Sequence, residues 1–346
     1  MNEERYKPAK TVHISGYTFA SPKLKGRRHP NSKPYTARTL FVYNVCQVLY
    51  AHNRFHTSVK KLVSDATRYK RFTECQAMAH DLHNLGYKLM LPTQIKQKHV
   101  KALTHYWESQ DLKPSTIAQK LSILRIFITW MGKQAIFDFL PMTDLFKNPE
   151  NLKRSHVTKE DKSWTTKTDV LAMLAAVEKV DLFVAIQLKM SHYFGLRAKE
   201  SMMFRPLADY DAIKGVLNVT RGTKGGRPRV IIVETNEQRK VLDEAMSLCH
   251  GKRSSLIPHI KSLGAWIKHY YKVCNRHGIS RDNGITPHGL RHGYSHRLYE
   301  EQTGQECKAV SGETPVVDVI ANRIARARVA QDMGHNRESI SSAYLG

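Results

Sequence analysis

The chain has 346 residues, too many for one ordinary hydrophobic core and enough for two domains with extensions. Hydrophobic residues make up 41% of it, which argues against a wholly disordered protein. The 55 lysines and arginines exceed the 30 acidic residues, and the net charge of +25 favours nucleic acid as a partner over a merely solvated basic surface.

Cysteine usage and hydropathy predict an intracellular protein. The five cysteines lie far apart and form no CxxC pair, which is typical of reduced thiols. The N-terminus lacks the apolar run of a signal peptide, and no stretch approaches the ~18 apolar residues of a membrane span. We therefore expect no membrane partner and a cytoplasmic protein that works at the prokaryotic nucleoid.

Residues 1–36 are predicted to form a basic, flexible arm. They carry eight lysines and arginines against two glutamates, and several glycines and prolines interrupt them. A disordered tail and a DNA-contacting arm explain this composition equally well.

Residues 37–140 are predicted to form a bundle of four or five helices. The clearest helix runs from Ser115, which is expected to cap it, to Met131. Its apolar residues recur at steps of three and four and so share one face: Ile117, Leu121, Leu124 and Ile128. Lys120 and Arg125 fall elsewhere on this helix and are candidate DNA contacts. Further helices are expected over 40–49 and 95–110.

Residues 141–165 are polar, contain two prolines and show little periodicity, so they are predicted to be an interdomain linker. Residues 166–346 are predicted to be a second domain, mainly α with a small antiparallel sheet. Helices are expected over 168–180, 182–194, 237–249, 263–277, 287–301 and 316–333. Two β-prone runs, 216–219 and 230–233, flank a glycine-rich basic tip and predict a hairpin.

Four segments of the second domain could carry chemistry. They are Gly195-Leu196-Arg197-Ala198-Lys199-Glu200, the hairpin tip with Lys224, His288-Gly289-Leu290-Arg291-His292, and Gly334-His335 followed by Tyr344. Each is weak alone, because a glycine-flanked lysine is usually a solvated turn residue and a terminal tyrosine usually packs or meets solvent.

Together the four segments resemble the tyrosine recombinase family of phage integrases and chromosome-dimer resolvases. The resemblance lies in Gly-Leu-Arg-x-x-Glu, a hairpin lysine, His-x-Leu-Arg-His, and Gly-His with a tyrosine nine residues after that histidine. It covers the whole second domain, and the helical bundle before it is similar to the family's SAM-like core-binding domain. The fold implied is that core-binding domain followed by a catalytic domain.

The resemblance implies a role for each matching residue. Tyr344 is the expected nucleophile, and Lys224 is the expected acid for the leaving 5′ oxygen. His288 would assist proton transfer, and His335 would hydrogen-bond a non-bridging phosphate oxygen. Glu200 and His292 would support the site.

Elementary chemistry agrees with the two remaining roles, those of Arg197 and Arg291. A phosphodiester repels nucleophiles, and fixed guanidiniums neutralise its oxygens and stabilise the charge of the transition state. The product would be a 3′-phosphotyrosine that stores the bond energy, so neither ATP nor a metal nor another cofactor is expected.

The resemblance also implies the partners. We expect double-stranded DNA, a homotetramer on two DNA sites, exchange through a Holliday junction, and DNA-bending accessory proteins. Integration or excision of a mobile element is the expected task. The basic residues of the hairpin, Arg221, Arg227 and Arg229, are further candidate DNA contacts.

The chain departs from the family pattern in two places. About twenty extra residues separate Arg291 from His335, and we place them in the polar stretch 301–315, as a surface loop or a subunit contact. The family's C-terminal tail after the tyrosine is missing, which leaves either truncation or another way of linking subunits.

Three alternatives stay open. The same constellation serves type IB topoisomerases and telomere resolvases. A DNA-binding regulator on an inactive recombinase fold would share the charge. His288, His292 and His296 recur every four residues, a spacing that can bind zinc, although no further ligand accompanies them and Arg291 lies within the run.

Overall fold

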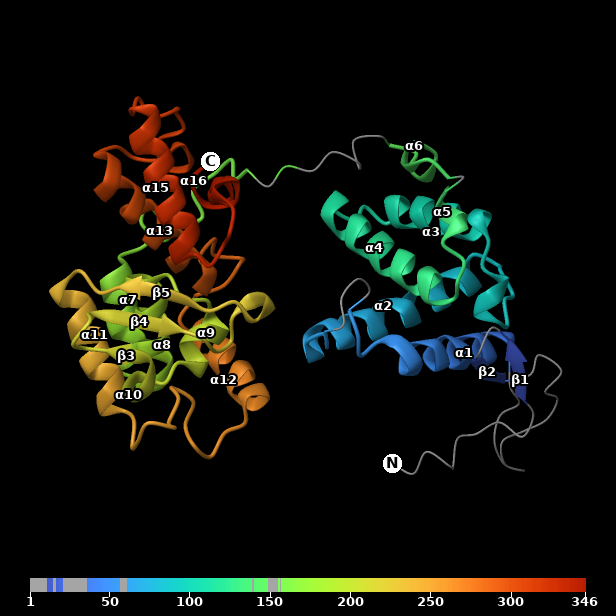
Figure 1. Ribbon diagram of the computed structural model, residues 1–346, viewed down its shortest axis with the longest axis horizontal. Helices are drawn as coiled ribbons and strands as arrows, with labels where there is room; N and C mark the ends of the chain where they lie inside the picture. Colours follow the sequence, from blue (N-terminus) through green and yellow to red (C-terminus); the bar gives the residue numbers. More distant parts are fainter. Residues whose placement is uncertain are drawn as a thin grey trace. The chain divides into compact units, whose positions relative to one another are not determined.

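The structure, a computed structural model, describes residues 11–14, 17–20, 36–56, 61–138, 140–148, 155 and 157–346. It separates the chain into two compact units that divide after Ser155 (Figure 1). Among the described helices, none combines the length and apolar character that crossing a bilayer requires.

The N-terminal unit is a bundle built on four long helices. They are α1 (Ala37–His52), α2 (Asp65–Asn84), α3 (Gln97–Ser109) and α4 (Pro114–Trp130), with the short η2 (Pro92–Gln94), α5 (Ala135–Asp138) and α6 (Met142–Leu145). Their apolar faces meet in one core that includes Phe41, Met78, Trp107, Leu124 and Phe127. The predicted helical domain is confirmed.

Two details of this bundle differ from the sequence prediction. No apolar stripe pointed clearly to α2, which is largely polar and buries only a narrow row of side chains that includes Cys75, Met78 and Leu82. Ser115 is not the cap of α4, because the helix already starts at Pro114. Proline suits that first position since its φ angle is fixed and it has no N–H to leave unpaired.

The predicted arm contains an antiparallel hairpin, β1 (Thr11–Ile14) paired with β2 (Tyr17–Ala20). The rest of residues 1–35 lies outside the described residues, so their predicted flexibility stays a prediction.

Parts of the predicted linker belong to the two units. Leu145 and Phe146 are buried in the core of the N-terminal unit. Trp164 is buried in the C-terminal unit, where its Nε1 donates to the carbonyl oxygen of Thr286 at 2.7 Å. Residues 149–154 and 156 lie outside the described residues.

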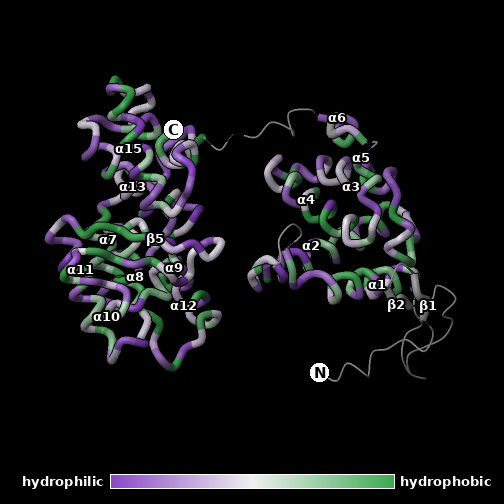
Figure 2. Tube along the Cα trace, viewed as in Figure 1, coloured by the Kyte–Doolittle hydropathy of each residue, from purple (hydrophilic) through white to green (hydrophobic). Residues whose placement is uncertain are grey.

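The C-terminal unit contains a three-stranded antiparallel sheet in the order β3 (Tyr210–Asp211), β4 (Val216–Val219), β5 (Arg229–Ile232). One face packs on α8 (Leu182–Phe194) and α11 (Asn236–Ser247) through a shared apolar core. Figure 2 shows hydrophobic residues along α8 and the strands.

The C-terminal unit contains further helices. They are α7 (Val170–Glu178), α9 (Ala198–Met203), α10 (Pro206–Asp209), α12 (Leu263–Arg276), α13 (Pro287–Thr303), α14 (Lys308–Ser311), α15 (Val319–Asp332) and α16 (Ser342–Leu345), with η4 (Lys224–Gly226) and η5 (Glu338–Ser341). α13, α14, α15 and α16 share a core of their own. The predicted class, mainly α with a small antiparallel sheet, is confirmed.

The extra residues near 301–315 are not simply a surface loop. Within them, α14 and the buried Cys307 and Ala309 pack in the same core as Tyr344 and Leu345 of α16. The segment therefore supports the helix that carries the candidate nucleophile.

Candidate active site

The six candidate catalytic residues come from five elements of the C-terminal unit. Arg197 is the N-cap of α9, and His288 and Arg291 lie on α13. The chain leaves α15 through Met333 and Gly334 to reach His335, and α16 carries Tyr344. The sixth, Lys224, lies on the tip between β4 and β5.

Gly195 lets the chain turn directly from α8 into Arg197. It ends α8 with a φ of 59°, a left-handed conformation that favours glycine. A Cβ here would come within 2.5 Å of the Met333 side chain and 2.6 Å of the Tyr294 ring. Both the backbone turn and the close packing therefore require glycine at position 195.

Two arginines meet at the end of α15. Arg291 is fully buried and donates to the carbonyl oxygens of Gly195 and Met333. Arg197 donates to the same Met333 oxygen at 3.1 Å, and its side chain is 20% exposed. Burial lowers the pKa of Arg291 to about 10, so it remains a cation at neutral pH.

The hydroxyl of Tyr344 lies between a cation and an imidazole. It accepts from Arg291 Nε at 3.2 Å and lies 3.5 Å from His335 Nε2. The tyrosine is only 5% exposed. Its backbone is held by His296 Nε2, 3.0 Å from the Tyr344 carbonyl oxygen, and farther along by Arg326, which donates to the Gly346 carbonyl at 3.0 Å.

Three histidines line α13 beside Tyr344. The ring centroids of His288 and His292 are 5.1 Å apart, those of His292 and His296 are 6.1 Å apart, and the His292 ring lies 4.9 Å from the Tyr344 ring. Within the described residues, no group of histidine, cysteine or carboxylate side chains has the arrangement of a metal site. The three histidines instead pack against Tyr344.

The histidines nearest the arginines favour the neutral form. Desolvation and then the charges of Arg291 and Arg197 lower the pKa of His288 to about 4. Desolvation, followed by Arg197, Arg291 and Lys224, lowers that of His335 to about 4 as well. Both imidazoles are therefore neutral at neutral pH, and the unprotonated nitrogen of each ring can accept a hydrogen bond.

Glu200 is buried and anchors the arginines. Its Oε1 lies 2.7 Å from Arg197 Nη1, and its Oε2 accepts from the Arg197 backbone N–H at 2.8 Å. Burial alone would raise its pKa, but the hydrogen bonds and charges of Arg229 and Arg197 lower it to about 2.

Lys224 stands apart from the other five. It is exposed at the hairpin tip, where Gly225 and Gly226 both have positive φ. No hydrogen bond joins it to another of these described site residues. Gly222 sets the approach of the hairpin, because a Cβ there would lie 2.7 Å from the Lys199 carbonyl oxygen.

The candidate DNA contacts differ in their availability. Arg227 is exposed. Arg221 pairs with Asp209 at 2.6 Å, and Lys120 pairs with Glu74 at 2.8 Å.

Two further candidates contact protein groups. The Arg125 guanidinium lies over the Phe137 ring at 4.7 Å. The prediction that Arg229 contacts DNA is wrong for this conformation, because its side chain is 4% exposed and bonded inward to Glu200. Strand β5 turns Arg229 and Ile231 to the buried side and Val230 to solvent.

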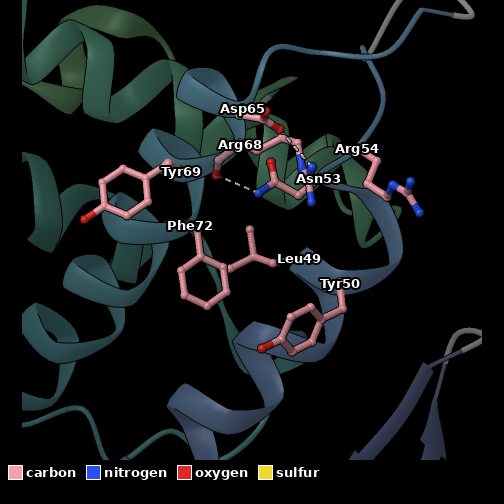
Figure 3. A pocket seen from close by; sticks show the side chains of 8 residues that line it. All are labelled: Leu49, Tyr50, Asn53, Arg54, Asp65, Arg68, Tyr69 and Phe72. Atoms are coloured by element: carbon pink, nitrogen blue, oxygen red, sulfur yellow. Dashed lines mark hydrogen bonds and ion pairs between the residues drawn. The ribbon is translucent and has the colours of Figure 1, made fainter. Parts of the chain in front are cut away.

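A depression in the N-terminal unit was not anticipated from the sequence. The end of α1 and the start of α2 line it with Leu49, Tyr50, Asn53, Arg54, Asp65, Arg68, Tyr69 and Phe72 (Figure 3). The rings of Tyr50 and Tyr69 are largely exposed. Asn53 Nδ2 donates to the Arg68 carbonyl at 2.8 Å and joins the two helices. Exposed arginines and aromatic rings together are typical of nucleic-acid surfaces.

Comparison with known proteins gives two family matches. Residues 154–297 match the family described as Integrase, and residues 58–137 match the one described as Phage integrase, N-terminal. The fold and the two matches define a protein with the integrase-type recombinase fold. The chain belongs to the phage integrase family of tyrosine recombinases. The curated proteins contain no sequence match to it.

Solved structures share the fold at low sequence identity. The Tn1549 transposon integrase in complex with circular intermediate DNA has 15% identity and a TM-score of 0.53, over 88% of this chain and 95% of that one. A lambda integrase dimer bound to a COC′ core site has 15% identity and a TM-score of 0.53, over 86% and 76%. A lambda integrase tetramer bound to a Holliday junction has 16% identity and a TM-score of 0.53, over 98% and 95%.

Proposed function

We propose that this chain is a site-specific DNA recombinase that cuts and rejoins double-stranded DNA through a covalent bond to Tyr344. One observation carries the proposal: the Tyr344 hydroxyl lies 3.2 Å from Arg291 Nε and 3.5 Å from His335 Nε2. A phenol held between a guanidinium and a neutral imidazole can lose its proton as it attacks a phosphorus atom.

The proposed step exchanges one phosphodiester for another. The Tyr344 oxygen bonds to phosphorus, and the bond from phosphorus to the 5′ oxygen breaks. Arg197 and Arg291 neutralise the phosphate oxygens. The negative charge of the bound phosphate raises the pKa of a neighbouring histidine. That histidine accepts the phenolic proton, and Lys224 supplies a proton to the departing 5′ oxygen. The 3′-phosphotyrosine is then attacked by a 5′-hydroxyl of the partner strand.

The net charge supports DNA as the substrate. A net charge of +25 suits a chain that neutralises many phosphates. By analogy with the lambda integrase tetramer on a Holliday junction, we propose four subunits on two DNA sites. Integration or excision of a mobile element fits this reaction, with DNA-bending proteins as helpers.

The test is a suicide DNA substrate with a nick beside the cleavage site, which traps the covalent adduct. Tyr344→Phe keeps the ring contacts with His292 but removes the nucleophilic oxygen. We expect the variant to bind DNA with unchanged affinity in a mobility-shift assay and to form no adduct. An adduct at the wild-type rate would overturn the assignment.

Two further outcomes separate the related activities. Relaxation of supercoiled plasmid without a specific site, by a monomer, would show a topoisomerase in place of a recombinase. Tight binding without an adduct from the wild-type chain would show a DNA-binding regulator.

A further inference from the structure

Arg229 is buried and joins three parts of the site. Its Nη1 and Nη2 donate to the two oxygens of Glu200 at 3.0 and 2.7 Å. Its Nε donates to the Asp332 carbonyl oxygen, at the end of α15, at 2.7 Å. A buried charge is stable only with such complete pairing, so this geometry is strongly determined.

Through Glu200, Arg229 influences the position of Arg197, a candidate phosphate-binding residue. The same carboxylate receives Arg197 at 2.7 Å and lies 3.9 Å from Arg291 Nη1. Without Arg229, Arg197 would lose the fixed position of its partner, because the freed carboxylate could rotate toward either remaining arginine.

Through the Asp332 carbonyl, Arg229 contacts the end of α15 and the turn that leads to His335. Asp332 precedes Met333, whose carbonyl receives Arg197 and Arg291, and the chain reaches His335 two residues later. A Cβ on Gly334 would come within 3.2 Å of the Arg229 side chain, so the turn closes directly over the guanidinium. Arg229 also lies on β5, at the base of the hairpin that carries Lys224.

We propose that Arg229 is a positioning residue, which fixes Glu200 and Arg197 and ties the base of the Lys224 hairpin to the turn that delivers His335. The inference rests on the proposed strand-cleaving function. Arg229 touches no DNA in this account, so its loss slows cleavage and leaves affinity for DNA intact.

The test measures adduct formation on the suicide substrate at saturating DNA. We expect Arg229→Met to lower the rate constant about 10- to 100-fold, because small misplacements of reacting groups have effects of this size, while the dissociation constant stays within about twofold. Arg229→Lys keeps the charge but not the paired geometry, so its rate should lie between those of Arg229→Met and the wild type.

Arg328→Met is the matched control. Arg328 also contacts Asp332, through the side chain at 3.3 Å, but it does not reach Glu200. It should destabilise the end of α15 without the rate loss of Arg229→Met. If Arg229→Met does not fold, Arg229→Lys decides alone, and a wild-type rate in that variant overturns the inference.

A double variant, Arg229→Met with Glu200→Gln, separates positioning from general damage. Residues that act as one unit give a double variant no slower than the worse single variant, whereas independent effects multiply and contradict the inference. Weakened DNA binding by Arg229→Met would instead show a direct DNA contact.

A wild-type chain that forms no adduct removes the proposed function and this inference with it, whereas an active wild type with an equally active Arg229→Met overturns the inference alone.

Discussion

At the residue scale, the site depends on a few backbone and carboxylate oxygens that hold three guanidiniums. Arg197 and Arg291 share the Met333 carbonyl, and Arg229 takes the carbonyl before it. Sequence motifs could predict Arg197 and Arg291, because their neighbours follow a family pattern. They could not predict the inward direction of Arg229, since a lone arginine among β-branched residues normally faces solvent.

A glycine at this scale gives a direct test of the packing. Gly195→Ala should lower the free energy of unfolding by about 2–4 kcal/mol, because it adds left-handed backbone strain and overpacking. Gly264→Ala is the control, since Gly264 lies in α12 with open space around it. Denaturant titration should show that control unchanged or slightly more stable, and equal stabilities of the two variants would contradict the packing argument.

At the element scale, apolar periodicity predicted most of the long helices but not which helices pack against one another. It missed α2, whose buried row is narrow and interrupted by charged residues. It also missed α14, because four residues are too short to show a helical period, and only the fold reveals that they pack beside α16. The hairpin was predicted from its glycine-rich tip and the β-prone runs beside it, and the structure places Lys224 exposed on that tip.

The hairpin yields a test of Lys224 as the proton donor. Lys224→Ala should slow cleavage of ordinary DNA, because the departing 5′ oxygen then lacks an acid. In a substrate with sulfur in place of that bridging oxygen, the departing sulfur needs no proton. The variant and the wild type should therefore cleave this substrate at similar rates. An equally large defect on both substrates would assign Lys224 to binding rather than to proton transfer.

At the scale of the whole molecule, the cationic C-terminal unit carries several histidines that resist protonation. Desolvation is the first cause in each case. It lowers the pKa of His192 and His292 to about 3, and that of His288 and His335 to about 4. The unfolded chain binds protons at these histidines below about pH 6.5, where the folded chain does not.

Stability should therefore fall as the pH drops from about 7 to 5. Each well-buried histidine contributes at most about 1.4 kcal/mol per pH unit below the unfolded pKa. Denaturant titrations at both pH values measure the loss, and His192→Gln should reduce it by removing one such group. Stability that stays constant or rises on acidification would contradict the buried, neutral state of these rings.

Whether Tyr344 is the nucleophile can be measured directly by finding which residue carries the covalently bound DNA. Adduct trapped on a suicide substrate is digested with nuclease and trypsin, and the peptide that retains a nucleotide is sequenced by mass spectrometry. We expect the nucleotide on Tyr344, in the fragment that follows Arg337. A nucleotide on any other residue would contradict it.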